Sequence, residues 1–141
     1  MKKREIAGFT LIEAMVLVAV LGILAAIGIP NYSRYVTRGH LVDAGNVLAE
    51  YRARMEQFYK DNSTYAKAGA CGQTTPTNLD SFAISCVVAN GGQAFTATAT
   101  GAGTTAGFVY TINHANVRAT AAIPSHWGSL TRDARNTWVT R

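Results

Sequence analysis

The 141-residue sequence has few of the side chains from which enzymes build active sites. Its three histidines are scattered, and past residue 62 the side-chain carboxylates are Asp80 and Asp133 alone. Two carboxylates so far apart are too few for a hard-cation site made of oxygen ligands. The sequence also lacks a glycine-rich phosphate loop, a Ser, His and Asp arrangement and clustered metal ligands. We therefore expect no enzyme activity, no metal and no cofactor.

The sequence lacks a strong charge of either sign. Thirteen Lys and Arg residues against eight Asp and Glu residues give a formal net charge of +5. A balance this small permits attraction to DNA or to an anionic surface but does not require it, because solubility alone needs a net charge of similar size. Net charge therefore does not identify a nucleic-acid-binding protein.

What the sequence does have is one long apolar segment, from Gly8 to Ile29, that is long enough to cross a bilayer. Lys2, Lys3 and Arg4 precede it, as the positive-inside rule expects of a cytoplasmic amino terminus. Glu13 lies five residues into this segment. Because a carboxylate in hydrocarbon costs a few kcal/mol, we expect Glu13 to have a functional partner. The alternatives are that it reaches the membrane interface from its shallow position, or that the segment is a plain anchor.

The residues around this segment follow a specific order. The leader KREIAG (residues 3–8) precedes FTLIEAMVLVAVLGILAAIGIPNY (residues 9–32), which contains an aromatic residue, a TLIE tetrapeptide, an apolar helix and a proline. In this order the first third of the chain closely resembles the class III signal and N-terminal helix of type IV pilins and their pseudopilin relatives. The resemblance implies that a prepilin peptidase cleaves after Gly8 and methylates the new amine of Phe9. It also implies that Glu13 meets the N-terminal ammonium of a neighbouring subunit during assembly.

The resemblance divides the chain into four segments. These are a leader peptide (1–8), a transmembrane and assembly helix (9–30), its amphipathic continuation (31–62) and a globular head with a connecting loop and a sheet (63–141). Loss of the leader removes three positive charges and one negative charge, so the net charge falls from +5 to +3.

The long helix contains a weak stretch. Gly22 and Gly28 lower helix propensity, and Pro30 removes a backbone donor. We therefore predict a helix break between Gly22 and Pro30. The resemblance implies that this region unwinds on assembly, as the comparable region does in pilins whose filaments are known.

The remainder of the chain predicts an α+β fold, in which the long N-terminal helix packs on a four-stranded antiparallel sheet. The helix should end near residues 61–63, and its apolar stripe at helical spacing should face the sheet. The stripe consists of Leu41, Ala44, Leu48, Tyr51, Met55 and Phe58. Past a long connecting loop, alternating residues predict the strands. The four strand-like runs are Phe82 to Val88, Phe95 to Thr100, Phe108 to Ile112 and Val117 to Ile123.

The two cysteines, Cys71 and Cys86, lie beyond the apolar segment, in the part expected outside the cytoplasm, where disulfides persist. We predict that they pair, which in the entropic description stabilises the domain by about 3 kcal/mol. A free thiol or a metal site is the alternative, but two cysteines without a nearby histidine lack a plausible ligand set. Many pilins carry a cysteine pair near the C-terminus. Here Thr137 precedes Trp138, so an adhesive role of such a C-terminal loop does not carry over.

The C-terminal part of the chain suggests a second class of function. Its arginines could contact DNA phosphates while Trp127 or Trp138 stacks on a base, as in DNA-uptake pilins. Ordinary subunit contacts would use the same residue types. The candidate arginines are Arg118, Arg132, Arg135 and Arg141.

The resemblance makes the expected function that of a structural subunit, major or minor, of a type IV pilus serving adhesion, motility or DNA uptake. The alternatives are a DNA-binding minor pilin for transformation and a type II secretion pseudopilin, which often binds calcium through an acidic loop that this chain lacks. The expected partners are the prepilin peptidase, other pilin subunits and the inner-membrane assembly platform. The precursor is expected to span the inner membrane once, with its N-terminus in the cytoplasm, and the assembled form to be extracellular.

Overall fold

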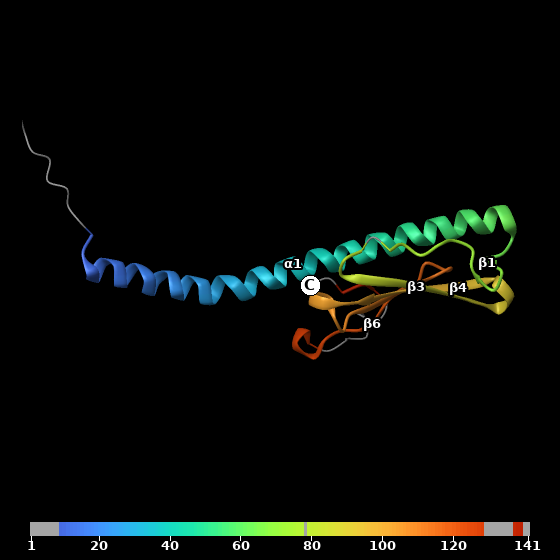
Figure 1. Cartoon of the computed structure of the whole chain (residues 1–141). Coiled ribbons are helices and arrows are strands. Elements are labelled where there is room, and N and C mark those ends of the chain that lie inside the picture. Colours follow the sequence, from blue (N-terminus) through green and yellow to red (C-terminus); the bar gives the residue numbers. More distant parts are fainter. Residues whose placement is uncertain (1–8, 78, 129–136, 140–141) are drawn as a thin grey trace, which may run out of the picture. The chain divides into compact units, whose positions relative to one another are not determined.

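The computed structural model describes residues 9–77, 79–128 and 137–139. The chain divides into two compact units, residues 1–36 and residues 37–141. One helix, α1 (Leu11–Asn62), runs through both units (Figure 1). Its C-terminal end is where the sequence predicted it.

The part of α1 in the first unit is largely apolar and mostly exposed. All side chains from Leu11 to Tyr35 are exposed. By length and composition this stretch could cross a membrane, with a mean hydropathy of 2.6 over an 18-residue window. Apolar surface of this extent is unfavourable in water, so the first unit needs lipid or other apolar helices around it.

The predicted break between Gly22 and Pro30 is not present, because α1 is continuous through Gly22, Gly28 and Pro30. A glycine costs a helix only about 1 kcal/mol relative to alanine, which a helix of 52 residues tolerates. Pro30 removes a backbone donor, but the side-chain amide of Asn31 donates a 3.0 Å hydrogen bond to the carbonyl oxygen of Ile27. The carbonyl that loses its donor is that of Ala26, four residues before Pro30, so this bond adds to the helix without replacing the missing one. Unwinding during assembly stays a prediction.

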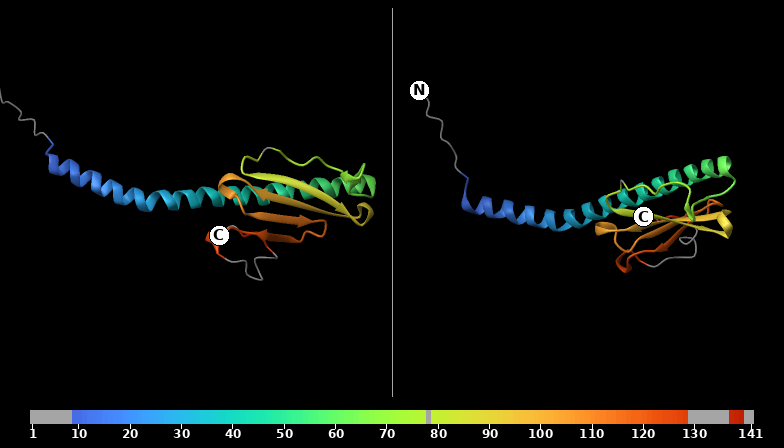
Figure 2. Two further views of the ribbon diagram at one scale, coloured as in Figure 1. Left: turned by 60° about the horizontal axis from the view of Figure 1, so that its bottom comes forward. Right: turned by 45° about the vertical axis from the view of Figure 1, so that its right-hand side comes forward.

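The second unit has its core between α1 and one face of the sheet (Figure 2). The helix stripe is buried as predicted, except that Phe58 is only half-buried. The inward-facing residues of the sheet are buried as well, which confirms the alternation read from the sequence. They are Phe95, Ala97, Ala99, Tyr110 and Ile112, together with Phe108 just before its strand.

The sheet has four antiparallel strands in the order β3-β4-β5-β6. Each strand begins and ends within one residue of the predicted run. The pairing is in register along β3 and β4, and a bulge interrupts it between Val109 and Tyr110. The bounds are β3 (Phe82–Ala89), β4 (Ala94–Gly101), β5 (Val109–Asn113) and β6 (Arg118–Ala122), with short 3₁₀ turns at Asn90–Gly92, Gly103–Thr105 and Ser125–Trp127.

The stretch predicted as a connecting loop contains a small hairpin. Its strands, β1 (Ala66–Lys67) and β2 (Ala70–Cys71), pair around Ala68 and Gly69, which have positive φ angles of 51° and 83°. Two-residue hairpin turns favour such angles. Strands of two residues are too short to show alternation in the sequence. A disulfide links Cys71 of β2 to Cys86 of β3, which confirms the predicted pairing.

Candidate functional site

The N-terminus of α1 is capped by Glu13. The Oε2 atom of Glu13 accepts hydrogen bonds of 3.5 Å from both the backbone N–H and the hydroxyl of Thr10. The N–H of Glu13 donates in return to Oγ1 of Thr10 at 3.4 Å. This reciprocal arrangement is a capping box, and it places the carboxylate at the positive end of the helix dipole. The bonds are long, so the carboxylate stays available to a stronger partner.

Glu13 lies in an otherwise apolar helix surface. An open groove of about 660 Å³ follows this face of α1. Phe9, at its start, is 70% exposed. A single carboxylate among apolar side chains suits a cation that arrives on another apolar helix, because the pair removes an isolated charge from an apolar environment. Gly8 and the rest of the leader lie outside the described residues. The groove is lined by Phe9, Thr10, Ile12, Glu13, Val16, Leu17, Val20 and Leu21.

In the second unit, Trp138 is held between the helix and the sheet. Its indole N–H donates a 3.0 Å hydrogen bond to the carbonyl oxygen of Thr111 in β5. One part of the ring lies so close to Gly45 of α1 that a Cβ atom there would be 2.9 Å from Cε3. The guanidinium of Arg118 lies over the ring, 4.8 Å from its centroid. Trp138 therefore packs as part of the fold.

Further bonds fix the backbone on both sides of Trp138. The hydroxyl of Thr120 donates a 2.7 Å hydrogen bond to the carbonyl oxygen of Thr137 and accepts one of 3.0 Å from the N–H of Val139. The buried hydroxyl of Tyr110 donates to the carbonyl oxygen of Val139. Burial also raises the pKa of Tyr110. Residues 137–139 are thus an integral part of the head.

These contacts change the DNA-binding hypothesis. Trp138 cannot stack on a base unless Arg118 leaves its face. Trp127 meets the ring of Phe108 edge-on, with centroids 5.1 Å apart. Arg118 is exposed and remains a candidate for phosphate contact. The other three candidates, Arg132, Arg135 and Arg141, lie outside the described residues.

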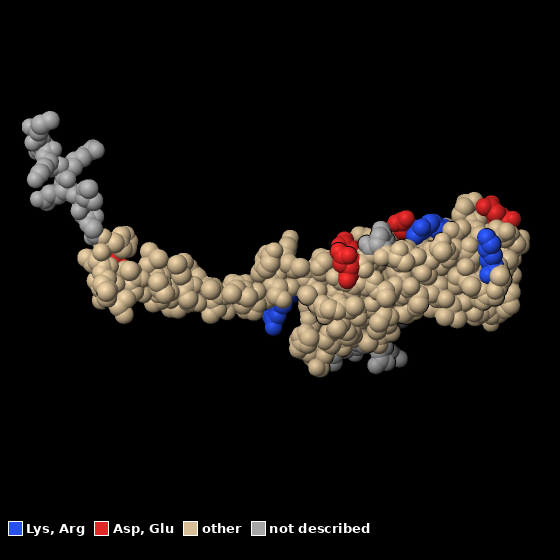
Figure 3. All heavy atoms as spheres, in the orientation of Figure 1, with Lys and Arg blue, Asp and Glu red and all other residues tan. Residues whose placement is uncertain are grey.

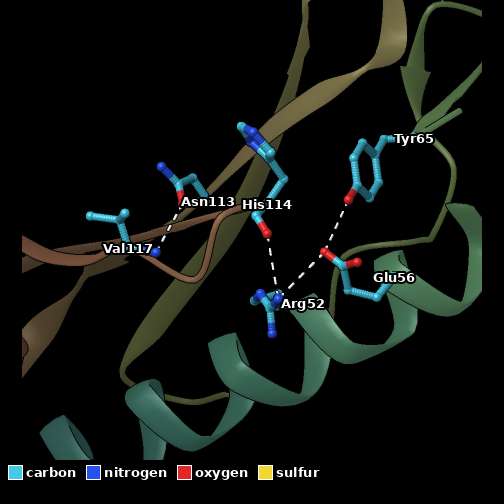
Figure 4. Close-up of polar contacts among 6 residues, drawn as sticks. All are labelled: Arg52, Glu56, Tyr65, Asn113, His114 and Val117. Carbon is cyan, nitrogen blue, oxygen red and sulfur yellow. Dashed lines mark hydrogen bonds and ion pairs between the residues drawn. The ribbon is translucent and has the colours of Figure 1, made fainter.

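A polar cluster that the sequence analysis missed joins α1 to the segments that follow it (Figure 4). Nη2 of Arg52 lies 3.6 Å from Oε1 of Glu56 and donates a 3.4 Å hydrogen bond to the carbonyl oxygen of His114. The hydroxyl of Tyr65 donates a 3.0 Å hydrogen bond to the same carboxylate oxygen. Burial, with this hydrogen bond, raises the pKa of Tyr65 to about 12. The cluster fixes the β5–β6 turn and the post-helix loop on the helix.

Charges elsewhere on the second unit are mixed. On the face shown in Figure 3, acidic and basic side chains are interspersed and form no field of one sign. Within the part of the chain that the structure describes, no group of three or more His, Cys, Asp or Glu residues is placed to hold a metal ion.

Comparison with known protein families gives two matches. Residues 30–108 match the family described as "Type IV minor pilin ComP, DNA uptake sequence receptor". Residues 3–29 match the "Prokaryotic N-terminal methylation motif". Together the two matches cover both the apolar helix and most of the head.

Individual relatives agree with these matches. The chain is 34% identical over 95 residues to the fimbrial protein EcpC of Eikenella corrodens, which covers 64% of this chain and 62% of that protein. It is 30% identical over 86 residues to the type IV major pilin protein PilE1 of Neisseria gonorrhoeae, over 60% of this chain and 40% of that one. The matched part thus spans less than two thirds of either relative. The crystal structure of the non-core minor pilin PilV of Neisseria meningitidis has the same fold, with a TM-score of 0.53 at 19% identity over 64% of this chain and 92% of that one.

Proposed function

This chain belongs to the type IV pilin family, and from that premise we propose that it is a structural subunit of a type IV pilus that polymerises through the N-terminal part of α1. The observation that carries the proposal is Glu13, a lone carboxylate in an exposed apolar helix face. The relatives named above are fimbrial and pilin proteins, which favours this role over type II secretion.

Assembly would follow processing of the leader. The leader motif implies a prepilin peptidase and contact with other pilin subunits. We propose cleavage between Gly8 and Phe9 and methylation of the amine of Phe9. The precursor would be held in the inner membrane by the apolar part of α1, with residues 1–8 in the cytoplasm, and pass through the assembly platform into an extracellular filament. The role is structural rather than catalytic.

The test must separate the charge of Glu13 from its capping role. Glu13→Gln keeps an acceptor for the capping box but removes the charge. Thr10→Val removes the capping hydroxyl and keeps the carboxylate. If Glu13 pairs with the ammonium of a neighbour, the Glu13→Gln variant is inserted and processed but poorly incorporated, and the Thr10→Val variant assembles.

Immunoblots of sheared filaments and membranes, with the mature N-terminus determined by mass spectrometry, give the readout. Normal incorporation of Glu13→Gln would exclude the charge pairing. An unprocessed methionine start on wild-type chain recovered from surface fibres would exclude the processing step. Absence of the wild-type chain from surface filaments would exclude the function itself.

A second candidate function is DNA binding during uptake, favoured by the description of the matched family as a DNA uptake sequence receptor. In this chain the exposed guanidinium of Arg118 would contact phosphate. A gel shift with the head lacking residues up to about 33 tests it. Binding of the DNA by the head should weaken as the salt concentration rises, and it should weaken in the Arg118→Ala variant. The Arg54→Ala variant should bind DNA as the unchanged head does, because Nε of Arg54 already lies 3.9 Å from Oε1 of Glu50. No retention at low ionic strength would remove this candidate.

A further inference from the structure

We propose that the groove beside Trp138 receives Asp43 of a second copy of this chain, with Arg118 as the cation of the pair. The inference rests on the proposed function as a filament subunit and names one contact between neighbouring heads. Both residues lie in the second unit, so the argument uses the structure of that unit alone.

The groove is formed where α1, β6 and the C-terminal segment meet. Its volume is about 390 Å³, and it is open to solvent on one side. Leu41, Val42 and Asn46 of α1 form one wall, and Arg118 and Trp138 form the other. Val42 is 47% exposed, so the wall offers apolar surface beside the polar groups. A groove with both apolar and polar surface suits an aspartate side chain together with the residues around it on a partner protein.

Arg118 is prepared to bind a carboxylate. Its guanidinium is positioned over the indole ring, and the ring is held by Thr111 and Gly45. Among the described residues, no carboxylate lies within 4 Å of Arg118. A guanidinium that stacks on an aromatic ring loses little further freedom when it binds an anion. The position therefore offers an oriented cation that has no carboxylate partner among the residues of its own copy that the structure describes.

Asp43 is the complementary group. It is exposed on α1, and no cation lies within 4 Å of it in the described parts of the chain. Other helix carboxylates already have local partners, since Glu50 and Glu56 face Arg54 and Arg52 at 3.9 and 3.6 Å. Asp43 stands on a rigid helix at the same level as the groove, which favours a defined contact.

Asp43 and the groove lie on different sides of α1. At 3.6 residues per turn, Asp43 is rotated by roughly 130° from the centre of the wall formed by Leu41, Val42, Gly45 and Asn46. Within one copy Asp43 and Arg118 form no ion pair within 4 Å, so the proposed pair joins two copies. A contact between two different patches is heterologous, and repetition of such a contact builds a ring or an open helical filament.

Charge reversal tests the pair in the full-length chain expressed in piliated cells that lack the native copy. Arg118→Glu and Asp43→Arg should each lower the amount recovered in sheared filaments by about tenfold, because each places like charges together. The double variant restores the attraction and should recover most of the loss. Recovery by the double variant also shows that misfolding did not cause the single defects. Normal incorporation of both single variants, or no recovery in the double variant, would overturn the proposal.

A cysteine cross-link supplies an independent readout. With Arg118→Cys and Asp43→Cys combined, oxidation of intact filaments should give a ladder of covalent oligomers under denaturing conditions. Each single variant can form at most a dimer and is the matched control, because Cys71 and Cys86 are already joined. Absence of a ladder, with the double-cysteine chain present in the filaments, would overturn the proposal.

These outcomes separate the inference from the proposed function. Absence of the wild-type chain from filaments contradicts the function. Presence of the wild-type chain with unaffected single variants contradicts only the contact. If Arg118→Glu abolishes DNA retention by the head and leaves assembly unchanged, the groove is a nucleic-acid contact and the inference is wrong.

Discussion

Gly45 shows how a single missing side chain positions the C-terminal segment. A Cβ atom at residue 45 would lie 2.9 Å from Trp138, and the hydrogen bond to Thr111 keeps the indole from moving away. At Gly39, on the same helix, nothing lies within 4 Å of the corresponding position. The two glycines therefore form a matched pair for substitution.

We expect Gly39→Ala to stabilise the chain by up to about 1 kcal/mol through helix propensity. Gly45→Ala has the same gain in helix propensity, but its Cβ atom overpacks against Trp138, which costs roughly 1–3 kcal/mol. Urea unfolding in detergent should thus give Gly45→Ala a lower free energy of unfolding than Gly39→Ala. Equal effects at the two positions would mean that Trp138 does not pack on the helix in solution.

Tyr65 makes stability depend on pH in the alkaline range. In the unfolded chain a tyrosine loses its proton near pH 10, whereas in the fold the pKa of Tyr65 is about 12. Between these values the unfolded state releases a proton that the folded state keeps, so stability is full below pH 10 and falls as pH rises toward 12. Tyr65→Phe should reduce this fall, as measured by thermal unfolding from pH 8 to 12. An unchanged slope would contradict the prediction.

At this scale the sequence reveals the chemistry of Glu13 but not all of its contacts. A carboxylate in an apolar segment stands out without a structure. The Thr10–Glu13 capping box also has a signature in the sequence, Thr-x-x-Glu before an apolar run, although it was not predicted. The environment of Trp138 depends on residues about 20, 27 and 93 positions away, namely Arg118, Thr111 and Gly45, so no local pattern could predict it.

Among the elements, the disulfide between β2 and β3 ties the short hairpin to the main sheet. The hairpin has only two residue pairs, which is too few for independent stability. The bond closes a loop over a sequence separation of 15 residues. Its position therefore holds the region between helix and sheet in place.

Replacing both cysteines, as Cys71→Ser with Cys86→Ser, should lower the free energy of unfolding by about 3 kcal/mol. Denaturant unfolding with and without reductant measures the effect. The reductant should destabilise the wild-type chain and leave the double variant unchanged. Equal stability of the oxidised wild-type chain and the double variant would contradict a structural role for the bond.

Element prediction succeeded where periodicity was long and failed where it was short or interrupted. The stripe from Leu41 to Met55 and the four strands repeat often enough to be recognised, and their ends were placed within a residue. The β1–β2 hairpin has an Ala-Gly turn in place of the Asn-Gly signal and was not predicted. Pro30 was expected to break α1, but the helix is continuous through it, because a proline removes a single backbone hydrogen bond from a helix of 52 residues.

The whole molecule combines two units with opposite solvent requirements. The first unit exposes the apolar side chains from Leu11 to Tyr35, whereas the second has a buried core of its own. The part of α1 from Thr37 onward, the sheet and the disulfide all belong to the second unit. Its stability therefore should not depend on the membrane.

We expect the chain from residue 34 onward to fold by itself when it is produced where disulfides form. Its free energy of unfolding should match that of the full chain in detergent within about 0.5 kcal/mol, because the buried core residues that the structure describes lie between Leu41 and Ile112. Circular dichroism and denaturant unfolding of both proteins provide the comparison. A large loss of stability on truncation would show that the first unit supports the head.

The fixed position of residues 137–139 also decides where a reporter can be attached. A fluorescent or epitope label inserted within these residues would disrupt the hydrogen bonds of Trp138 and Val139. The tip of the small hairpin, at Ala68 and Gly69, is exposed and tolerates a bend without supporting the core. Tags intended to follow this protein in living cells belong at that tip.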